Sequence, residues 1–196
     1  MTHYYSKEND SLKTNEKLIY VNIKEQKYSF KTDHGVFSKA GLDFGSRLLI
    51  ENVIPINSES FLDLGCGYGP LGIIYKTNNP KTKVMMTDVN DRAIKLTQKN
   101  ASLNKVEVEA FYSDGFSEIT NTFDLIITNP PIRAGKDVVY RIFTDAAKFL
   151  HDKGNFIFVI NQKQGAPSAI KKCESIYREV EVIAKKSGYY IIKCIK

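Results

Sequence analysis

The sequence lacks several features that would assign it to a membrane or secreted protein. No apolar run approaches the roughly 20 residues that a transmembrane helix needs. The first residues, "MTHYYSKENDSLKTNEK", are polar and contain no apolar segment typical of a secretory signal. Cysteine is scarce, because Cys66, Cys173 and Cys194 are an odd number and show no metal-ligand spacing. We therefore expect a cytoplasmic protein whose cysteines are small core residues.

Internal repeats and low-complexity linkers are also missing. The 196 residues, of which 42% are hydrophobic and 26% charged, suit one globular domain with a short appendage, and we expect a monomer. The formal net charge of +6 comes from residues 148–196, which hold ten lysines and arginines against four acids. Two interpretations remain open: this part of the chain contacts a polyanion, or it presents a solvated lysine-rich face.

From residue 60 onward, short β-type runs alternate with helical patterns. The predicted strands are 60–65, 83–88, 106–112, 123–129 and 154–160, and the predicted helices lie at 69–79, 90–104 and 137–153. This alternation predicts parallel strands with helices on both faces of the sheet. The last residues, "REVEVIAKKSGYYIIKCIK", read as two strands around "KKSG". We therefore predict an α/β fold with a seven-stranded, mostly parallel sheet that ends in an antiparallel C-terminal hairpin.

The N-terminal part differs from this alternating core. Residues 17–36 contain two β runs around the polar "KEQ", which predicts a small β-hairpin. "FSKAGLDFGSRLLIENVI" follows and predicts a helix from about Gly41 or Asp43. We expect residues 1–36 to be an extension packed on a core domain of residues 37–196.

"FLDLGCGYGPLGI" (61–73) combines a strand, a glycine-rich turn and a helix. Glycines at 65, 67 and 69 allow a tight turn and close approach of the backbone to a ligand. Dinucleotide folds carry a further glycine where this chain has Pro70, and the Asp63 carboxylate would repel a pyrophosphate. The pattern disfavours an NAD-dependent dehydrogenase and suits a ligand with an amine and a sulfonium.

Acids follow two further strands. Asp88 ends the next strand, where an acid commonly binds ribose hydroxyls, and Asp114 in "YSDGF" is a candidate acceptor for an adenine amino group. Either acid alone also fits a helix cap or a turn. Since the carboxyl ends of parallel strands share one edge of the sheet, the acids together favour an adenosyl ligand without phosphates, beside Asn129.

"TNPPI" (128–132) closes the fourth predicted strand with two prolines. Prolines cannot donate to the hydrogen-bond ladder of a central strand, and the residue before a proline is held extended. The stretch therefore predicts a stiff turn that aims the amide of Asn129 and the carbonyl of Pro130 in fixed directions.

These motifs resemble those of class I S-adenosylmethionine-dependent methyltransferases. "DLGCGYG" resembles the cofactor loop, with Asp63, Gly65, Gly67 and Gly69; "TDVN" resembles the ribose-binding segment, with Asp88 and Asn90; and "SDG" resembles the adenine-side acid Asp114. "TNPPI" resembles the Asn-Pro-Pro-aromatic motif of enzymes that methylate planar amino groups. "HYYS" (3–6) and "DHGVFSKAGLDFGSRLLIE" (33–51) are similar to the small-subunit (16S) ribosomal RNA guanine-N2 methyltransferases, in a short single-domain form.

The resemblance implies a Rossmann-like doubly wound fold, S-adenosylmethionine as cofactor, ribosomal RNA or the small subunit as partner, and no metal. Asn129 and Pro130 would each accept one hydrogen of the target amine, and Pro131 would hold the turn. Ile132 departs from the motif, because relatives place an aromatic residue there to stack on the target.

The residues of the predicted entrance carry two open interpretations each. Phe37 could stack on the base or belong to the core. Lys39, Arg133 and Lys136 could contact RNA phosphates, which position rather than specify, or could be plain surface charges. Alternative functions are methylation of adenine-N6 or of a protein glutamine amide, or a catalytically silent RNA-binding assembly factor.

Overall fold

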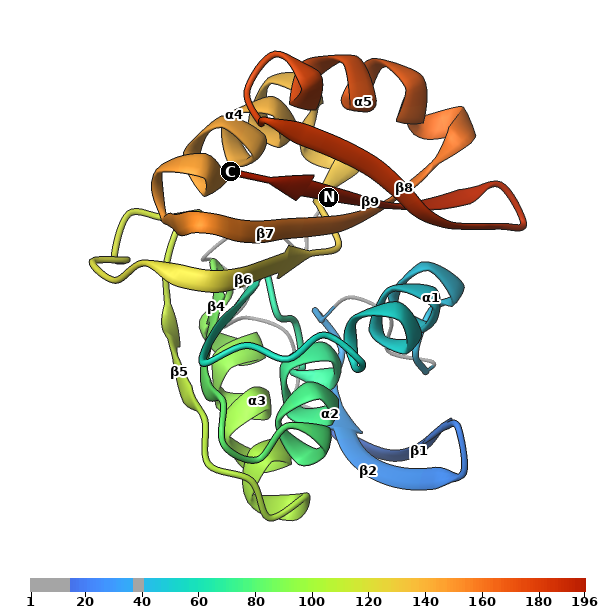
Figure 1. Ribbon diagram of the computed structural model, residues 1–196. Helices are drawn as coiled ribbons and strands as arrows, with labels where there is room; N and C mark the ends of the chain where they lie inside the picture. Colours follow the sequence, from blue (N-terminus) through green and yellow to red (C-terminus); the bar gives the residue numbers. More distant parts are fainter. Residues whose placement is uncertain (1–14, 37–40) are drawn as a thin grey trace.

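The protein is built around a seven-stranded sheet with helices on both faces and a separate two-stranded sheet (Figure 1). The structure is a computed structural model, and it describes residues 15–36 and 41–196. The strands are β1 (Lys17–Ile23), β2 (Gln26–Thr32), β3 (Ser60–Leu64), β4 (Lys83–Asp88), β5 (Glu109–Tyr112), β6 (Phe123–Thr128), β7 (Leu150–Asn161), β8 (Glu179–Lys186) and β9 (Tyr189–Ile195). The helices are α1 (Phe44–Val53), α2 (Pro70–Asn78), α3 (Asp91–Leu103), α4 (Lys136–Lys148) and α5 (Ala166–Glu174), with short 3₁₀ turns η1 (Ile132–Ala134) and η2 (Gln162–Gln164).

The strand order of the large sheet is β5-β4-β3-β6-β7-β9-β8. Strands β3 to β7 are parallel, and β9 runs antiparallel to both β7 and β8. This is the predicted Rossmann-like sheet with its C-terminal hairpin. Because the chain builds outward from β3 in both directions, the switch in strand order lies between β3 and β6. Ligands of open α/β sheets bind beside such a switch point.

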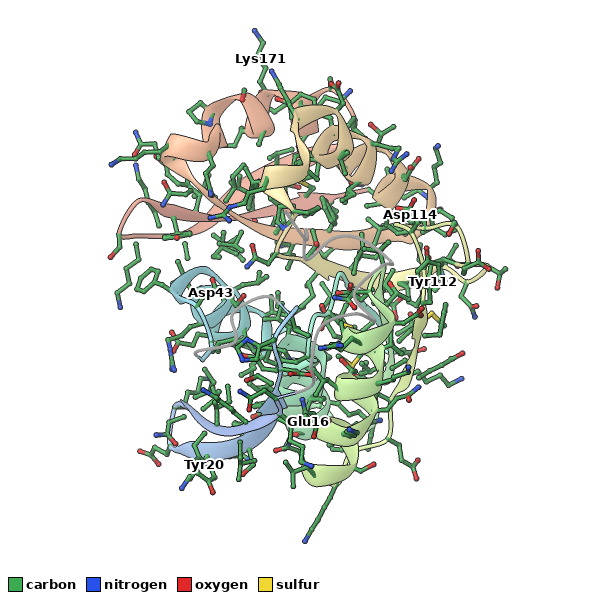
Figure 2. The ribbon with its side chains drawn as sticks, turned by 180° about the vertical axis from the view of Figure 1, so that it is seen from behind. Glu16, Tyr20, Asp43, Tyr112, Asp114 and Lys171 are labelled. Atoms are coloured by element: carbon green, nitrogen blue, oxygen red, sulfur yellow. The ribbon has the colours of Figure 1, made fainter. Side chains whose placement is uncertain are left out.

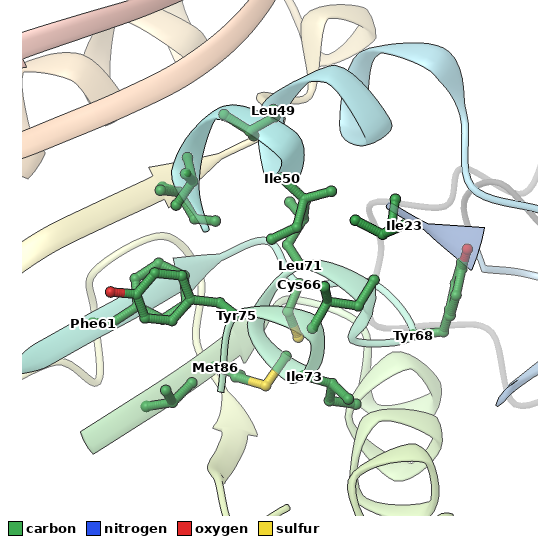
Figure 3. Close-up of a cluster of buried hydrophobic side chains, with 14 of the residues drawn as sticks. Ile23, Leu49, Ile50, Phe61, Cys66, Tyr68, Leu71, Ile73, Tyr75 and Met86 are labelled. Carbon is green, nitrogen blue, oxygen red and sulfur yellow. The ribbon is translucent and has the colours of Figure 1, made fainter. Parts of the chain in front are cut away.

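Two apolar layers sandwich the large sheet. Helices α1, α2 and α3 cover one face, while α4 and α5 cover the other (Figure 1). Neighbouring residues of β3 point to opposite layers: Phe61 packs with the first group of helices and Leu62 with the second, as the two-residue period of a strand requires. Figure 3 shows the first layer, in which the ring of Phe61 packs at a tilt against Tyr75 of α2, with ring centroids 4.4 Å apart.

The β1–β2 hairpin packs one of its faces into this first layer. Its residues Ile23 and Phe30 are buried there, and the Phe30 ring meets Tyr68 of the glycine loop edge-on at 5.7 Å. The side chain of Asn100 in α3 bonds both backbone groups of Lys31, with Oδ1 accepting from the amide nitrogen at 2.7 Å and Nδ2 donating to the carbonyl at 2.9 Å. The hairpin therefore shares the core of the main sheet. The domain boundary at residue 36 stays a prediction.

Several predicted element ends agree with the structure. Asp43 is the N-cap of α1 and accepts a hydrogen bond from the backbone of Ser46, and Asn90 caps α3 in the same way. The C-terminal hairpin turns at Ser187 and Gly188, both with positive φ, as two-residue hairpin turns require. The cysteines are free and buried.

Other element ends were predicted wrongly. The helix predicted over 137–153 ends at Lys148, because the carbonyl of Phe149 accepts from the amide of Phe123 and leads the chain into β7. Strand β5 begins at Glu109, three residues later than predicted. Helix α5 was not predicted at all, although a glycine and a proline mark its start, as is common for helices. None of the described helices is long and apolar enough to cross a membrane.

We expect Phe30→Ala to lower the free energy of unfolding by about 3–5 kcal/mol, because it empties a buried ring site between the hairpin and the glycine loop. Tyr20→Ala, on the opposite face of the hairpin where Tyr20 is 58% exposed, is the control and should change stability little. Chemical denaturation measures both. Equal stability of the two variants would show that the hairpin is not part of the cooperative core.

Candidate cofactor and substrate site

A large cavity opens at the carboxyl ends of β3, β4 and β6. Its volume is about 1120 Å³, above the roughly 300–1,000 Å³ of usual single-ligand pockets. Its walls come from the glycine loop after β3, the turn after β4, the "SDGF" segment after β5, the "TNPPI" turn after β6, and the start of α1. The cavity thus has room for a cofactor together with part of a second molecule.

The glycine loop forms one wall and leaves space for a ligand. Gly65 and Gly67 line the cavity with φ of 75° and 60°, and a Cβ atom added to either would meet no protein atom within 4 Å. Gly69 serves a different purpose, because a Cβ there would lie 2.9 Å from Ile73 and 3.0 Å from Thr97. The first two glycines therefore keep backbone open to a ligand, whereas Gly69 lets α2 begin close to α3.

Asp88 lies beside this loop at the end of β4. Its Oδ2 accepts from the Gly67 amide at 2.8 Å, and its Oδ1 accepts from the Asn90 amide at 2.9 Å. Burial raises the pKa of Asp88 to about 6, against the opposing effect of the backbone donors. Each carboxylate oxygen keeps a lone pair, so the group can still accept hydrogen bonds from a pair of hydroxyls. Asn90 also lines the cavity, while its side chain caps α3 and donates to the Gly35 carbonyl.

Asp63 does not line the cavity, although it was expected to face a cofactor. Its side chain is fully buried behind the loop, where Oδ2 accepts from the Gly72 amide at 2.8 Å and Oδ1 has no hydrogen-bond partner in the structure. Burial raises its pKa to about 7, and the charge of Asp88 adds to that rise. Asp63 therefore stabilises the loop and the first turn of helix α2 through its hydrogen bond to Gly72.

Asp114 lies at the far rim of the cavity and is well exposed. Its nearest charged partner is Arg141 of α4, with 3.9 Å between Oδ1 and Nη2. In Figure 2, Asp114 and Asp43, which both line the cavity, lie on opposite sides of the view. Two of the three acids, Asp88 beside the loop and Asp114 at the rim, therefore line the same cavity, whereas Asp63 lies behind its wall.

The "TNPPI" turn is locked by its own backbone. Pro131 has φ −76° and ψ 74°, and the Ile132 amide donates to the Pro130 carbonyl at 2.8 Å, which is an inverse γ-turn. Before it, the Thr128 hydroxyl donates to the Leu64 carbonyl at 2.8 Å and ties the ends of β6 and β3 together. The Pro130 carbonyl thus already accepts one hydrogen bond and has one lone pair left for a ligand.

Asn129 lines the cavity with its amide side chain. The Nδ2 atom donates to the hydroxyl of Ser46 in α1 at 2.9 Å. Oδ1 accepts no hydrogen bond from the described part of the chain. Asn129, whose amide oxygen accepts no hydrogen bond from the described residues, and Pro130 therefore both lie at the cavity wall.

The start of α1 and Tyr68 are site residues that the sequence did not single out. Asp43 Oδ1 caps α1, but its Oδ2 is buried without a hydrogen-bond partner in the structure, as is the Tyr68 hydroxyl. Both residues line the cavity, and burial together with the Asp43 charge raises the pKa of Tyr68. The only local signal was the N-cap pattern at Asp43, which indicated a helix start rather than a ligand. Unpartnered polar atoms at a cavity wall suit a polar ligand group.

The residues predicted to contact substrate are distributed unevenly. Ile132 and Arg133 line the cavity, whereas Lys136 borders a smaller adjoining pocket near Tyr140. Phe37 and Lys39, like the "HYYS" segment, lie outside the described residues.

The fold and this site define an α/β protein with a ligand cavity at the switch point of its sheet, where an open glycine loop lies beside the carboxylate of Asp88. The chain belongs to the methyltransferase small domain family, which matches residues 27–193.

Two curated relatives show the range of this likeness. The chain is 46% identical to the uncharacterised protein YbxB of Bacillus subtilis strain 168, over 99% of this chain and 98% of that protein. It is 32% identical to ribosomal RNA small subunit methyltransferase C of Escherichia coli, over 84% of this chain and 48% of that protein. The chain therefore spans about half the length of this second relative.

A solved structure of an RsmC protein also matches this chain. The structure of the T. thermophilus 16S rRNA guanine-N2 methyltransferase RsmC, in complex with AdoMet and guanosine, superposes with a TM-score of 0.83 at 25% identity. It covers 92% of this chain and 50% of that chain. The protein is an S-adenosylmethionine-dependent methyltransferase related to RsmC, and S-adenosylmethionine is its cofactor. The open glycine loop and the unpartnered polar atoms fit that cofactor.

Because the pKa of Asp63 is raised, its contribution to stability should be present below about pH 4 and lost as the pH rises through about 7. Asp63→Asn keeps an acceptor for the Gly72 amide but carries no charge. We therefore expect the free energy of unfolding of this variant, minus that of wild type, to be larger at pH 8 than at pH 5, by on the order of a few kcal/mol. Denaturation of the cofactor-free protein at both pH values measures this. Asp152→Asn, at an exposed site, is the control. A difference that does not change with pH would contradict the assignment.

Proposed function

We propose that this methyltransferase transfers a methyl group to an exocyclic amino group, most specifically guanine-N2 of 16S ribosomal RNA. The observation that carries this proposal is the pair of acceptors in the "TNPPI" turn, the unpartnered Oδ1 of Asn129 and the carbonyl of Pro130. Asn129 is held by its hydrogen bond to Ser46 and the Pro130 carbonyl by its bond from the Ile132 amide, and all four residues line the cavity.

The chemistry requires such acceptors. The lone pair of an exocyclic amine is delocalised into the ring, so the nitrogen is a poor nucleophile. When Asn129 Oδ1 and the Pro130 carbonyl each accept one amino hydrogen, the nitrogen can become tetrahedral with its lone pair directed away from them. The cofactor supplies an electrophilic methyl group. The nitrogen gains that carbon as the carbon–sulfur bond breaks, and it then loses one proton to solvent.

The rigidity of the turn is part of this mechanism. Preorganised acceptors stabilise the positive charge that develops on the nitrogen without reorganising during the reaction. The γ-turn at Pro131 and the proline rings hold the acceptors in place. Ile132 at the cavity wall would cover the base by van der Waals contact, in place of the aromatic residue of related motifs.

We assign the cofactor to the wall around the glycine loop. Asp88 would accept hydrogen bonds from the ribose hydroxyls, and the backbone at Gly65 and Gly67 would approach the cofactor closely. Asp43 Oδ2 and the Tyr68 hydroxyl would face the polar amino-acid end. Asp114, at the rim, would contact the adenine amino group. Asp63 would act through the loop that it supports, and Gly69 and Asn90 would shape the wall.

Guanine in ribosomal RNA is the proposed target because the relatives point to it. One curated relative is a small-subunit ribosomal RNA methyltransferase, and the structure of another holds guanosine. Arg133 at the cavity and Lys136 beside it supply positive charge for RNA phosphates. Three buried free cysteines support action in the reducing cytoplasm.

The test is to incubate the protein with methyl-labelled S-adenosylmethionine and, separately, 30S subunits, naked rRNA and total cell protein. We expect label in 16S RNA as N2-methylguanine. Asn129→Ala should lower the rate roughly 10²–10³-fold, the scale seen when one preorganised transition-state hydrogen bond is removed. Label in adenine or in a glutamine amide would show that this group, and not guanine-N2, is the target. Cofactor binding without any transfer would indicate a catalytically silent assembly factor.

The cofactor assignment has its own test in the affinity of Asp88 variants. We expect Asp88→Ala to weaken S-adenosylmethionine binding about 10- to 150-fold, since hydrogen bonds to charged groups contribute about 1.5–3 kcal/mol. Because the ionised form accepts the hydroxyls and its pKa is raised to about 6, wild-type affinity should fall below that pH. Calorimetry at pH 5.5 and 7.5 measures both effects, with Asp91→Asn as the control. An Asp88→Ala variant that binds like wild type would remove this residue from the cofactor site.

A further inference from the structure

A hydrogen bond joins α1 to the "TNPPI" turn across 83 positions of sequence. The donor is Nδ2 of Asn129, and the acceptor is the hydroxyl oxygen of Ser46, at 2.9 Å. It is the one side-chain hydrogen bond that Asn129 forms within the described part of the chain. Ser46 also lines the cavity, so the bond lies at the wall of the site itself.

The position of Ser46 is fixed from several sides. It is the third residue of α1 and only 6% exposed, and its amide donates to the N-cap carboxylate of Asp43 at 3.1 Å. The first turn of α1 also packs tightly against β9, because a Cβ atom at Gly45 would lie 3.1 Å from the ring of Tyr189. Phe44 adds a ring contact to Tyr189, with centroids 5.4 Å apart. The Ser46 hydroxyl is therefore a fixed anchor rather than a mobile surface group.

In the observed bond the Ser46 oxygen accepts from Nδ2, which leaves Oδ1 as the end of the Asn129 amide that is available to a ligand. The amide group is planar, so holding Nδ2 at Ser46 directs Oδ1 away from it. The last torsion of an asparagine side chain is otherwise broad and roughly two-fold. Without the anchor, the amide could turn its NH₂ group toward an incoming amine, and a donor would then meet a donor.

We infer that Ser46 is a positioning residue for methyl transfer, which sets the orientation of the Asn129 amide so that its oxygen is presented to the target amine. This inference rests on the proposed role of Asn129. It gives α1 a task in catalysis beyond covering the sheet. It also explains why the "LDFGS" segment and the "TNPPI" turn, distant in sequence, meet at one wall.

Kinetics with 30S subunits and labelled S-adenosylmethionine test the inference. Ser46→Ala should lower kcat about 2- to 12-fold, the equivalent of one neutral hydrogen bond, while the KM for 30S subunits and the cofactor affinity stay unchanged. Ser102→Ala, the same substitution at an exposed helix position in α3, is the matched control and should leave kcat unchanged. Full turnover by Ser46→Ala would overturn the inference.

A double-mutant comparison separates positioning from a general structural effect. In an Asn129→Ala background, Ser46→Ala should cause no further loss, because no amide remains to be oriented. Equal losses with and without Asn129 would overturn the inference. Asn129→Ala with wild-type turnover would instead overturn the proposed function, so the two failures are distinct.

A measurement without substrate completes the test. In protein labelled with ¹⁵N at asparagine, the side-chain NH₂ resonances of Asn129 are those lost in Asn129→Ala. We expect these resonances to shift, and their exchange with water to accelerate, in Ser46→Ala but not in Ser102→Ala. Unchanged resonances in Ser46→Ala would show that the bond does not hold the amide, and would overturn the inference.

Discussion

The hydrogen bond between the buried carboxylate of Asp63 and the amide of Gly72 is the constraint on which the site depends. It joins the end of β3 to the first turn of α2, where a backbone donor has no partner within the helix. The loop between them is held further by the bond of Gly67 to Asp88 and by those of Gly65 and Cys66 to the Thr87 carbonyl. Burial disfavours the charged form of Asp63 and raises its pKa, so the group that holds the loop costs free energy when it is ionised.

The same edge of the sheet brings together two kinds of rigid element with different tasks. The glycine loop brings backbone and the Asp88 carboxylate to the cavity, while the turn after β6 brings the Asn129 amide and the Pro130 carbonyl to it. The bond from Thr128 to Leu64 ties the ends of their strands together, and the first turn of α1 contacts the second element through Ser46. A cavity between fixed walls suits a reaction in which positioning and electrostatics do most of the catalysis.

The chain matches its relatives over different shares of their length. It covers nearly all of YbxB but only about half of the RsmC proteins of E. coli and T. thermophilus. The glycine loop, Asp88 and the "TNPPI" turn all lie within the part of the chain that the family match covers.

The sequence by itself determined the alternation of strands and helices, the glycine loop and the stiffness of the "TNPPI" turn, because each follows from local periodicity or from the backbone limits of glycine and proline. It also placed Asp88 at a strand end, since parallel strands end at one edge. Only the tertiary structure decided which acids face the cavity: Asp63 turned out to be behind the wall, while Asp43 lies on it. The hydrogen bond between Ser46 and Asn129 was also decided by the tertiary structure, because it depends on how α1 packs against the sheet. No local sequence pattern indicates a contact between residues so far apart in the chain.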